Sequence, residues 1–354
     1  AMTGRFNRMM MVETSMTLFS SVPCLRAVRL SFLGLASTVA LASTTAFAAA
    51  SDPFPTHPVV IKVAYPAGGG ADVATRQLTQ RLSQALGQTV VIENLGGAGG
   101  SVATLAFLRQ PPDGYQLLSL TGNDAVMNPI TSAAAKYKPE NLRLVHPLII
   151  SDFALVTARD DAPASLDALI ARMKAPGAPE YSFGNWGVGS TPHLAAEDFR
   201  RQAGVKTLDV PYRGVSPIVQ DLLGKGLDFA FLPVISSVLD LIRGGKLKVV
   251  GMGTTARNQQ LPDVPSTGDS KILKNFDYKV WPGVFVHSTT PEPVVAKLHA
   301  AISAVVNSPE YQKWSVDSGN NPMTPMSLAQ ADAFYRDELT RGRRLAAAMN
   351  LQPQ

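Results

Sequence analysis

The stretch from Val59 to Asp72 constrains the fold of this chain more than any other. It joins an apolar, β-branched run to a turn with three consecutive glycines, and a helical pattern starts directly afterwards. Glycine has no Cβ, so a ligand can approach the backbone at such a turn, and the first N–H groups of a helix attract anions. Two interpretations stay open from this stretch alone: a cradle for a carboxylate or phosphate, and an ordinary tight turn between strand and helix.

Strand and helix patterns alternate along the chain, which indicates an α/β fold. Ala74, Leu78 and Leu82 recur at helical spacing, and Gly87 is expected to end their helix. In the first part we expect a strand at residues 59–65, a helix at 71–86, strands at 89–93 and 115–120, and a helix between them that follows a glycine cluster at 96–100. Strands separated by helices form right-handed βαβ units, so a mostly parallel sheet is predicted.

Two extended stretches divide the chain. The first, residues 144–157, is expected to be broken at Pro147 and Asp152, and the second covers residues 278–287. Each is a candidate crossing between two lobes. The predicted organisation is therefore lobe 1 at residues 54–155 and 280–354, and lobe 2 at residues 156–279.

A second strand–glycine loop–helix unit lies early in lobe 2. A short strand at residues 181–184 is followed by Gly187-Val188-Gly189-Ser190 and a helix to Gln202, with Thr191 as the expected N-cap and Pro192 in the first turn. Ligands of open α/β sheets lie beyond the carboxyl ends of the strands. Two such loops are therefore expected to face each other across a cleft.

The first 48 residues are typical of a secretory signal peptide. A basic region at Arg26 and Arg29 precedes an uncharged run at residues 30–42, and small residues at Ala48 to Ala50 suit cleavage. An uncleaved membrane anchor is the alternative, which Ser and Thr within the run disfavour. The net charge is +5, but without this leader 28 basic and 26 acidic residues remain. We therefore expect an exported, periplasmic protein with no affinity for nucleic acid.

Familiar catalytic and cofactor motifs are missing from the sequence. Neither glycine cluster has the third glycine of a dinucleotide fingerprint, and no Walker loop or Gly-x-Ser-x-Gly occurs. The single cysteine, Cys24, lies in the leader, and the histidines are scattered singly. Ser190 precedes His193 by three residues, but we expect His193 to pack or cap a helix. We predict no catalytic residue, no metal and no cofactor.

Several segments together resemble the Bug family, the periplasmic solute-binding receptors of tripartite tricarboxylate transporters. They follow the family's order over nearly the whole chain after the leader: YPAGGGADVATR at 65–76, EN at 93–94 with GAGG at 97–100, PDGY at 112–115, GVGSTPHL at 187–194, VPYRG at 210–214, LPDVP at 261–265 and WPG at 281–283. Each motif is weak alone, and their order is specific.

This resemblance implies a two-lobed Venus-flytrap fold that clamps a small organic acid or acidic amino acid and delivers it to integral-membrane transporter subunits. It implies that the loops Ala67–Asp72 and Gly187–His193 hold the ligand through backbone groups. We expect a monomer. The predicted ligand-binding residues are Tyr65, Ala67, Gly68, Gly69, Gly70, Ala71, Asp72, Asn123, Trp186, Gly187, Val188, Gly189, Ser190, Thr191, His193, Tyr212 and Arg213.

For several of these residues a structural role stays open beside the ligand contact. Asp72 can favour the helix N-terminus or bind a ligand donor, and Arg213 can clamp a carboxylate or face solvent. Tyr212 can line the cleft or pack on Pro211, and Trp186 can form a wall or fill the core. Two other functions also stay open: a ligand sensor coupled to a membrane kinase, and a periplasmic lyase or hydrolase.

Overall fold

The computed structural model describes residues 54–354, apart from 134, 322, 352 and 354. The predicted signal peptide lies outside the described residues. The stretch that opens the fold begins with β1 (Val59–Val63) and continues through the glycine turn into α1 (Gly70–Leu86). As predicted, α1 buries Ala74, Leu78 and Leu82, and it ends at Gly87, which takes the left-handed conformation at φ 67°.

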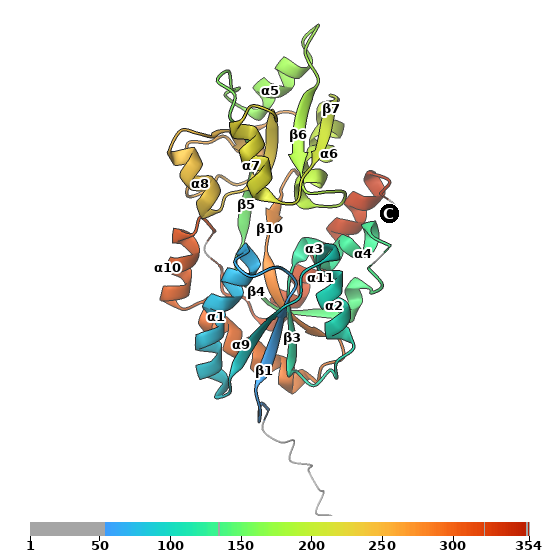
Figure 1. Ribbon diagram of the computed structural model, residues 1–354, viewed down its shortest axis with the longest axis vertical. Coiled ribbons are helices and arrows are strands. Elements are labelled where there is room, and N and C mark those ends of the chain that lie inside the picture. The colour runs from blue at the N-terminus through green and yellow to red at the C-terminus, as the bar shows by residue number, and fades with distance from the viewer. Residues whose placement is uncertain (1–53, 134, 322, 352, 354) are drawn as a thin grey trace, which may run out of the picture. The chain divides into compact units, whose positions relative to one another are not determined.

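Two separate sheets organise the described chain, each flanked by helices (Figure 1). The first sheet has the strand order β2-β1-β3-β11-β4 and comprises β1, β2 (Val90–Asn94), β3 (Gln116–Thr121), β4 (Leu142–Pro147) and β11 (Pro282–His287). The second has the order β10-β5-β8-β6-β7, with β9 also paired to β5, and comprises β5 (Ser151–Thr157), β6 (Tyr181–Asn185), β7 (Thr207–Pro211), β8 (Phe229–Pro233), β9 (Lys248–Met252) and β10 (Lys279–Val280). We call each sheet with the helices packed on it lobe 1 and lobe 2, in that order.

Helices cover both faces of the first sheet, because successive side chains of its strands point to opposite sides. In β11, Val284 and Val286 join one buried cluster and Phe285 joins the other. One face packs against α1, α9 (Glu292–Val306) and α10 (Pro309–Asp317), and the other against α2 (Ser101–Leu108), α3 (Gly122–Val126), α4 (Asn128–Thr131) and α11 (Leu328–Ala348).

The second sheet follows the same rule. Phe183, Phe229 and Phe231 point to the face covered by α5 (Leu166–Met173) and α6 (Thr191–Ala203). Ala230 and Leu232 point to the face covered by α7 (Val215–Leu223) and α8 (Ser236–Arg243). Short 3-10 turns occur at Ala98–Gly100, Pro139–Asn141 and Thr267–Asp269.

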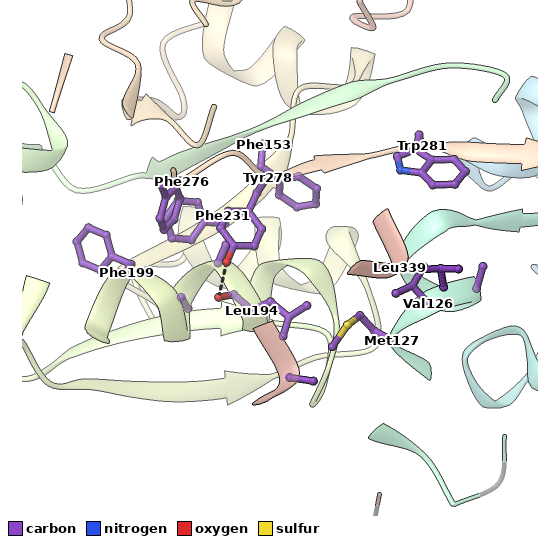
Figure 2. Close-up of a cluster of buried hydrophobic side chains, with 14 of the residues drawn as sticks. Val126, Met127, Phe153, Leu194, Phe199, Phe231, Phe276, Tyr278, Trp281 and Leu339 are labelled. Atoms are coloured by element: carbon purple, nitrogen blue, oxygen red, sulfur yellow. Dashed lines mark hydrogen bonds between the residues drawn. The ribbon is translucent and has the colours of Figure 1, made fainter. Parts of the chain in front are cut away.

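A buried apolar cluster connects the two lobes. Figure 2 shows it running from Phe199 and Phe231 of lobe 2, past Leu194 of α6, to Met127 and Leu339 of lobe 1. The Tyr278 hydroxyl lies within this cluster and donates to the Leu194 carbonyl at 3.3 Å. Side chains that are far apart in sequence therefore share one core across the junction.

Polar side chains hold the junction where β5 and β10 lie (Figure 1). Asp152 is only 4% exposed, and its carboxylate accepts hydrogen bonds from Asn258 at 2.9 Å and Asn321 at 2.8 Å. The turn after α10 also touches lobe 2, because the Ser318 carbonyl accepts from the Ser236 N–H at 3.0 Å. Three chain segments thus meet at this junction.

Three details differ from the sequence predictions. Both sheets are mixed rather than mostly parallel, because β11 runs antiparallel to β3 and β4, and β5 runs antiparallel to β8, β9 and β10. Asp152 does not break the extended stretch but lies within β5, where the two asparagines satisfy its carboxylate. Ser190, not Thr191, is the N-cap of α6, since its backbone is extended and α6 begins at Thr191.

The exact lobe boundaries stay a prediction. The chain changes sheets between Pro147 and Ser151, and again between Val280 and Pro282. Among the described helices, none has both the length and the apolar character needed to cross a bilayer.

Candidate binding cleft

A cavity of about 620 Å³ lies between residues of the two lobes, a size typical of small-molecule sites. Lobe 1 contributes Tyr65, Gly99, Asn123, Asp124, Asn128, Thr131 and Ser132, and lobe 2 contributes Trp186, Val188, Gly189, Ser190, Arg213, Gly214 and Val215. A neighbouring cavity of about 40 Å³, which Thr191 helps to line, is large enough for only a few water molecules.

The loops that line this cavity follow the carboxyl ends of strands. The residues after β6 and β7 lead into α6 and α7, and those after β3 lead into α3. β6 and β7 are parallel neighbours, so their following loops meet at one edge of the second sheet. The sheet topology therefore brings together residues that are distant in sequence, such as Ser190 and Arg213.

Two of the helices that open at the cavity lack a side-chain cap from their N-cap residue. Gly214 precedes α7 and has no side chain to offer. Ser190 precedes α6, but its hydroxyl donates to the Gly187 carbonyl at 2.6 Å instead of capping the helix. The first-turn N–H groups of both helices therefore carry uncompensated partial positive charge beside the cavity.

Gly189 lies at a close approach between the lobes. Its φ is +80°, and a Cβ there would come within 2.5 Å of the Thr131 hydroxyl oxygen of α4. The loop is further shaped by Asn185, whose side-chain oxygen accepts from the Gly187 N–H at 2.8 Å. Only glycine fits at position 189 without moving one wall of the cavity.

Arg213 is the cation of the cavity lining. Its side chain is exposed, and no described residue forms an ion pair or hydrogen bond with its guanidinium. Neighbouring Tyr212 is not part of the lining; its hydroxyl donates to Asp221 at 2.5 Å, and its partial burial raises its pKa to about 12. The Arg213 guanidinium is therefore available to bind a ligand carboxylate, whereas the Tyr212 hydroxyl is bonded to Asp221 and does not line the cavity.

Trp186 lines the cavity and also packs on Phe153, with ring centroids 6.0 Å apart. His193 is half-buried beside the lining, and its Nδ1 accepts from the Gly189 N–H at 3.4 Å. Burial lowers the pKa of His193, so the neutral imidazole is favoured. Ser190 and His193 are thus bonded to backbone groups rather than to each other.

The triple-glycine loop is placed differently. Ala67 to Gly70 are exposed and do not belong to the cavity lining, although Tyr65 before them does. Asp72 is fully buried and accepts from the Gly68 N–H, Arg76 and Asn94, each at 2.8 Å. This geometry favours a role for Asp72 in stabilising the N-terminus of α1 over a contact with a ligand. Ala71 is half-buried within α1.

The most prominent residue that sequence reasoning missed is Asp124 of α3. Its carboxylate accepts from the Tyr65 hydroxyl at 2.5 Å, and burial raises the pKa of both groups. No local pattern identifies this pair, because its members are 59 positions apart. Asn128 was also missed; its amide donates to the carbonyls of Ala98 and Gly99 and fixes the second glycine cluster of lobe 1.

No group of three or more His, Cys, Asp or Glu within the described residues could hold a metal ion. The cavity instead combines a guanidinium, uncapped helix ends and amide groups with a carboxylate on one wall. Such a lining can bind an organic anion through charge and hydrogen bonds.

Comparison with known proteins yields likenesses along most of the chain. A sequence profile described as the tripartite tricarboxylate transporter family receptor, TctC, matches residues 74–351. Protein BugT of Bordetella pertussis is 32% identical over 297 residues, covering 82% of this chain and 89% of BugT. A UPF0065 protein of the same species is 30% identical over 326 residues, covering 92% of this chain and 99% of that protein.

Solved structures show the same fold. The periplasmic binding protein BugD superimposes with a TM-score of 0.70 at 28% identity, covering 85% of this chain and all of BugD. MatC from Rhodopseudomonas palustris, solved with bound malate, gives a TM-score of 0.70 at 24% identity, covering 82% of this chain and 99% of MatC. At that identity, the likeness to MatC concerns the fold alone.

Proposed function

The chain belongs to the tripartite tricarboxylate transporter receptor family, and from this premise we propose that it binds a small carboxylic acid between its two lobes and delivers it to a membrane transporter. Receptors of this family and the structural neighbour BugD are periplasmic binding proteins. We place this chain in the periplasm on the same ground.

The observation that carries the proposal is the composition of the cavity wall in lobe 2. Arg213 has no partner among the described residues, and the uncapped first turns of α6 and α7 open beside it. A guanidinium and free N–H groups are donors that suit a carboxylate, and a partly desolvated site strengthens such bonds. We assign the ligand carboxylate to this wall.

The lobe 1 wall is proposed to hold the rest of the ligand. Asn123 supplies an amide group there, and Tyr65 and Asp124 lie beside it. MatC, which shares the fold, holds the dicarboxylate malate. Malate is therefore a sensible first compound to test on this chain.

A binding role without chemistry is part of the proposal. The described cavity lining offers no activated nucleophile, because the Ser190 hydroxyl donates to Gly187 and His193 is bonded to the Gly189 N–H. Recovery of each tested acid unchanged after long incubation is the expected result. Turnover would instead support the lyase or hydrolase interpretation.

Thermal unfolding and calorimetry with a panel of small carboxylic acids, malate included, test the binding role. A true ligand at 100 times its Kd is expected to stabilise the protein by about 2.7 kcal/mol. Arg213→Gln is expected to weaken binding roughly tenfold or more, because a hydrogen-bonded charge is lost.

Arg336→Gln is the matched control, because Arg336 is exposed on α11 and its side chain has no described partner. It changes the net charge equally and is expected to leave Kd unaltered. If no acid raises the unfolding temperature, the proposed function is wrong. If both variants bind like the wild type, the carboxylate does not lie on Arg213.

A further inference from the structure

A carboxylate, that of Asp124, lies in the wall of a cleft proposed to take up an acid. Asp124 is half-buried and lines the same cavity as Arg213, on the lobe 1 side. No described lysine, arginine or histidine forms an ion pair with it. An anion bound in this cavity would therefore meet a negative group that the protein itself leaves without a cation.

Asp124 is held firmly in place by other bonds. Its N–H donates to the Thr121 hydroxyl at 3.2 Å, and its carbonyl accepts from the Tyr137 hydroxyl at 3.0 Å. Side-chain atom Oδ2 accepts from the Tyr65 hydroxyl at 2.5 Å. The first two bonds fix the backbone of Asp124, and the third holds its carboxylate, which would lose the Tyr65 bond if it turned away from its present position.

Hydrogen-bond capacity remains on Oδ1. Among the described residues, the hydrogen bond given for Oδ1 comes from the Asn123 amide at 3.5 Å, which is a weak contact, whereas a carboxylate oxygen can accept two bonds. Tyr65 cannot serve the ligand as a donor, because its single proton goes to Asp124 while its oxygen accepts from the Thr121 N–H at 2.9 Å. The lobe 1 wall thus offers a ligand an acceptor with negative charge.

We propose that Asp124 is a specificity-determining residue that selects acids carrying an ammonium group, so that the substrate class is amino acids rather than plain dicarboxylic acids. This inference rests on the proposed function, in which Arg213 holds the carboxylate. An amino acid places a negative group against Arg213 and a positive group against Asp124, and each protein charge gains an opposite partner. A plain dicarboxylate places its second negative group against Asp124 and is disfavoured.

Matched acids that differ only at one position provide the test in the wild-type protein. Calorimetry is carried out with L-aspartate, L-malate and succinate, and with the pairs L-glutamate and glutarate, and L-phenylalanine and 3-phenylpropionate. Within each set the amino acid is expected to bind tightest, roughly tenfold or more above the compound with neither amino nor hydroxyl group. Malate is expected between aspartate and succinate, because a hydroxyl donates without carrying charge.

Asp124→Asn tests the residue itself. The amide oxygen can still accept from Tyr65, but the charge is gone. The ratio of Kd between succinate and aspartate is expected to fall roughly tenfold, with aspartate losing affinity and succinate gaining it. Asp337→Asn, at an exposed position of α11, removes the same charge elsewhere and is expected to keep the ratio.

Each outcome decides the proposal. If the acids without an amino group bind as tightly as their amino partners, the selection by Asp124 is wrong while the receptor function stands. If the ratio survives in Asp124→Asn, another residue selects the ligand and the proposal is likewise overturned. If no acid binds to the wild type or to Asp124→Asn, the proposed receptor function is wrong, and the selection by Asp124 is wrong with it. The wild-type comparison decides even where Asp124→Asn does not fold.

Discussion

The two strand–glycine loop–helix units of this chain have nearly the same local pattern and different surroundings. In the first, Ala67 to Gly70 are exposed and lie outside the cavity lining. In the second, Gly189 and Ser190 are buried and form part of the cavity wall against Thr131. A glycine loop before a helix therefore does not by itself identify the ligand site.

The difference lies in how each loop satisfies its own polar groups. Asp72 reaches back to the Gly68 N–H and ties the first loop to Arg76 and Asn94. In the second loop the Ser190 hydroxyl is bonded to Gly187, and no acidic side chain occupies the first turn of α6. An acid built into the protein stabilises the first turn internally, whereas the positive end of the second turn has no acidic side chain of its own helix beside it.

The largest expected effect tests the internal role of Asp72. Asp72→Ala removes the acceptor of three hydrogen bonds, so the free energy of unfolding is expected to fall by about 3 kcal/mol. Urea unfolding at pH 7 measures it. Asp263→Ala changes an exposed carboxylate with no described bond and is expected to cost less than about 0.5 kcal/mol. Equal losses in the two variants would contradict the comparison.

The same variant has a defined pH signature. Burial raises the pKa of Asp72, but the bonds from Arg76, Asn94 and the Gly68 N–H outweigh it and leave the pKa below its ordinary value. A lowered folded-state pKa means that the stabilisation is complete above the unfolded value of about 3.9 and is lost as pH falls through the folded value. Part of the difference between wild type and Asp72→Ala is thus expected to disappear in strong acid.

The next effect concerns the second loop. Gly189→Ala places a methyl group against Thr131 and is expected to weaken binding of the tightest acid roughly tenfold, because one wall of the cavity must shift. Gly187→Ala is the matched control, since Gly187 also has a positive φ, +106°, but a Cβ there meets nothing within 4 Å. Similar losses in both variants would show that backbone strain, not the approach of the lobes, matters.

The smallest effect is expected at the first loop. A Cβ at Gly70 meets no atom within 4 Å, and Gly70 is the first residue of α1. Gly70→Ala is expected to raise the free energy of unfolding by up to about 1 kcal/mol and to change ligand Kd less than about twofold. A tenfold loss of affinity would place the ligand against the triple-glycine loop and abolish the distinction between the two loops.

Local pattern was sufficient to predict most of the elements. The spacing of Ala74, Leu78 and Leu82 reflects burial on one face of α1, and the helix stops at Gly87 because glycine readily takes the left-handed conformation. Strand direction was predicted less well, because whether β11 runs with or against β3 depends on where the chain returns from lobe 2. That information is not local.

The sequence predicted those cavity residues that lie in local motifs and missed those whose role depends on residues far away in the chain. Trp186, Gly189, Ser190 and Arg213 lie on loops with recognisable motifs, and all four line the cavity. Asp124 lies on the short helix α3, whose five residues are too few to show a period, and its role depends on Tyr65 in the turn after β1. When the role of a side chain depends on a partner far away in sequence, the residues next to it carry no pattern that predicts that role.

The attachment of the turn after α10 to lobe 2 has a mechanical consequence. Two strands that pass side by side between rigid bodies allow those bodies both to bend and to twist about the strands. A third attachment links Ser318 to Ser236 and Asn321 to Asp152, and we expect it to oppose the twist more than the bend. The same residues of the two cavity walls would then face each other whenever the lobes approach, so the relative positions of the walls would be set by the protein itself.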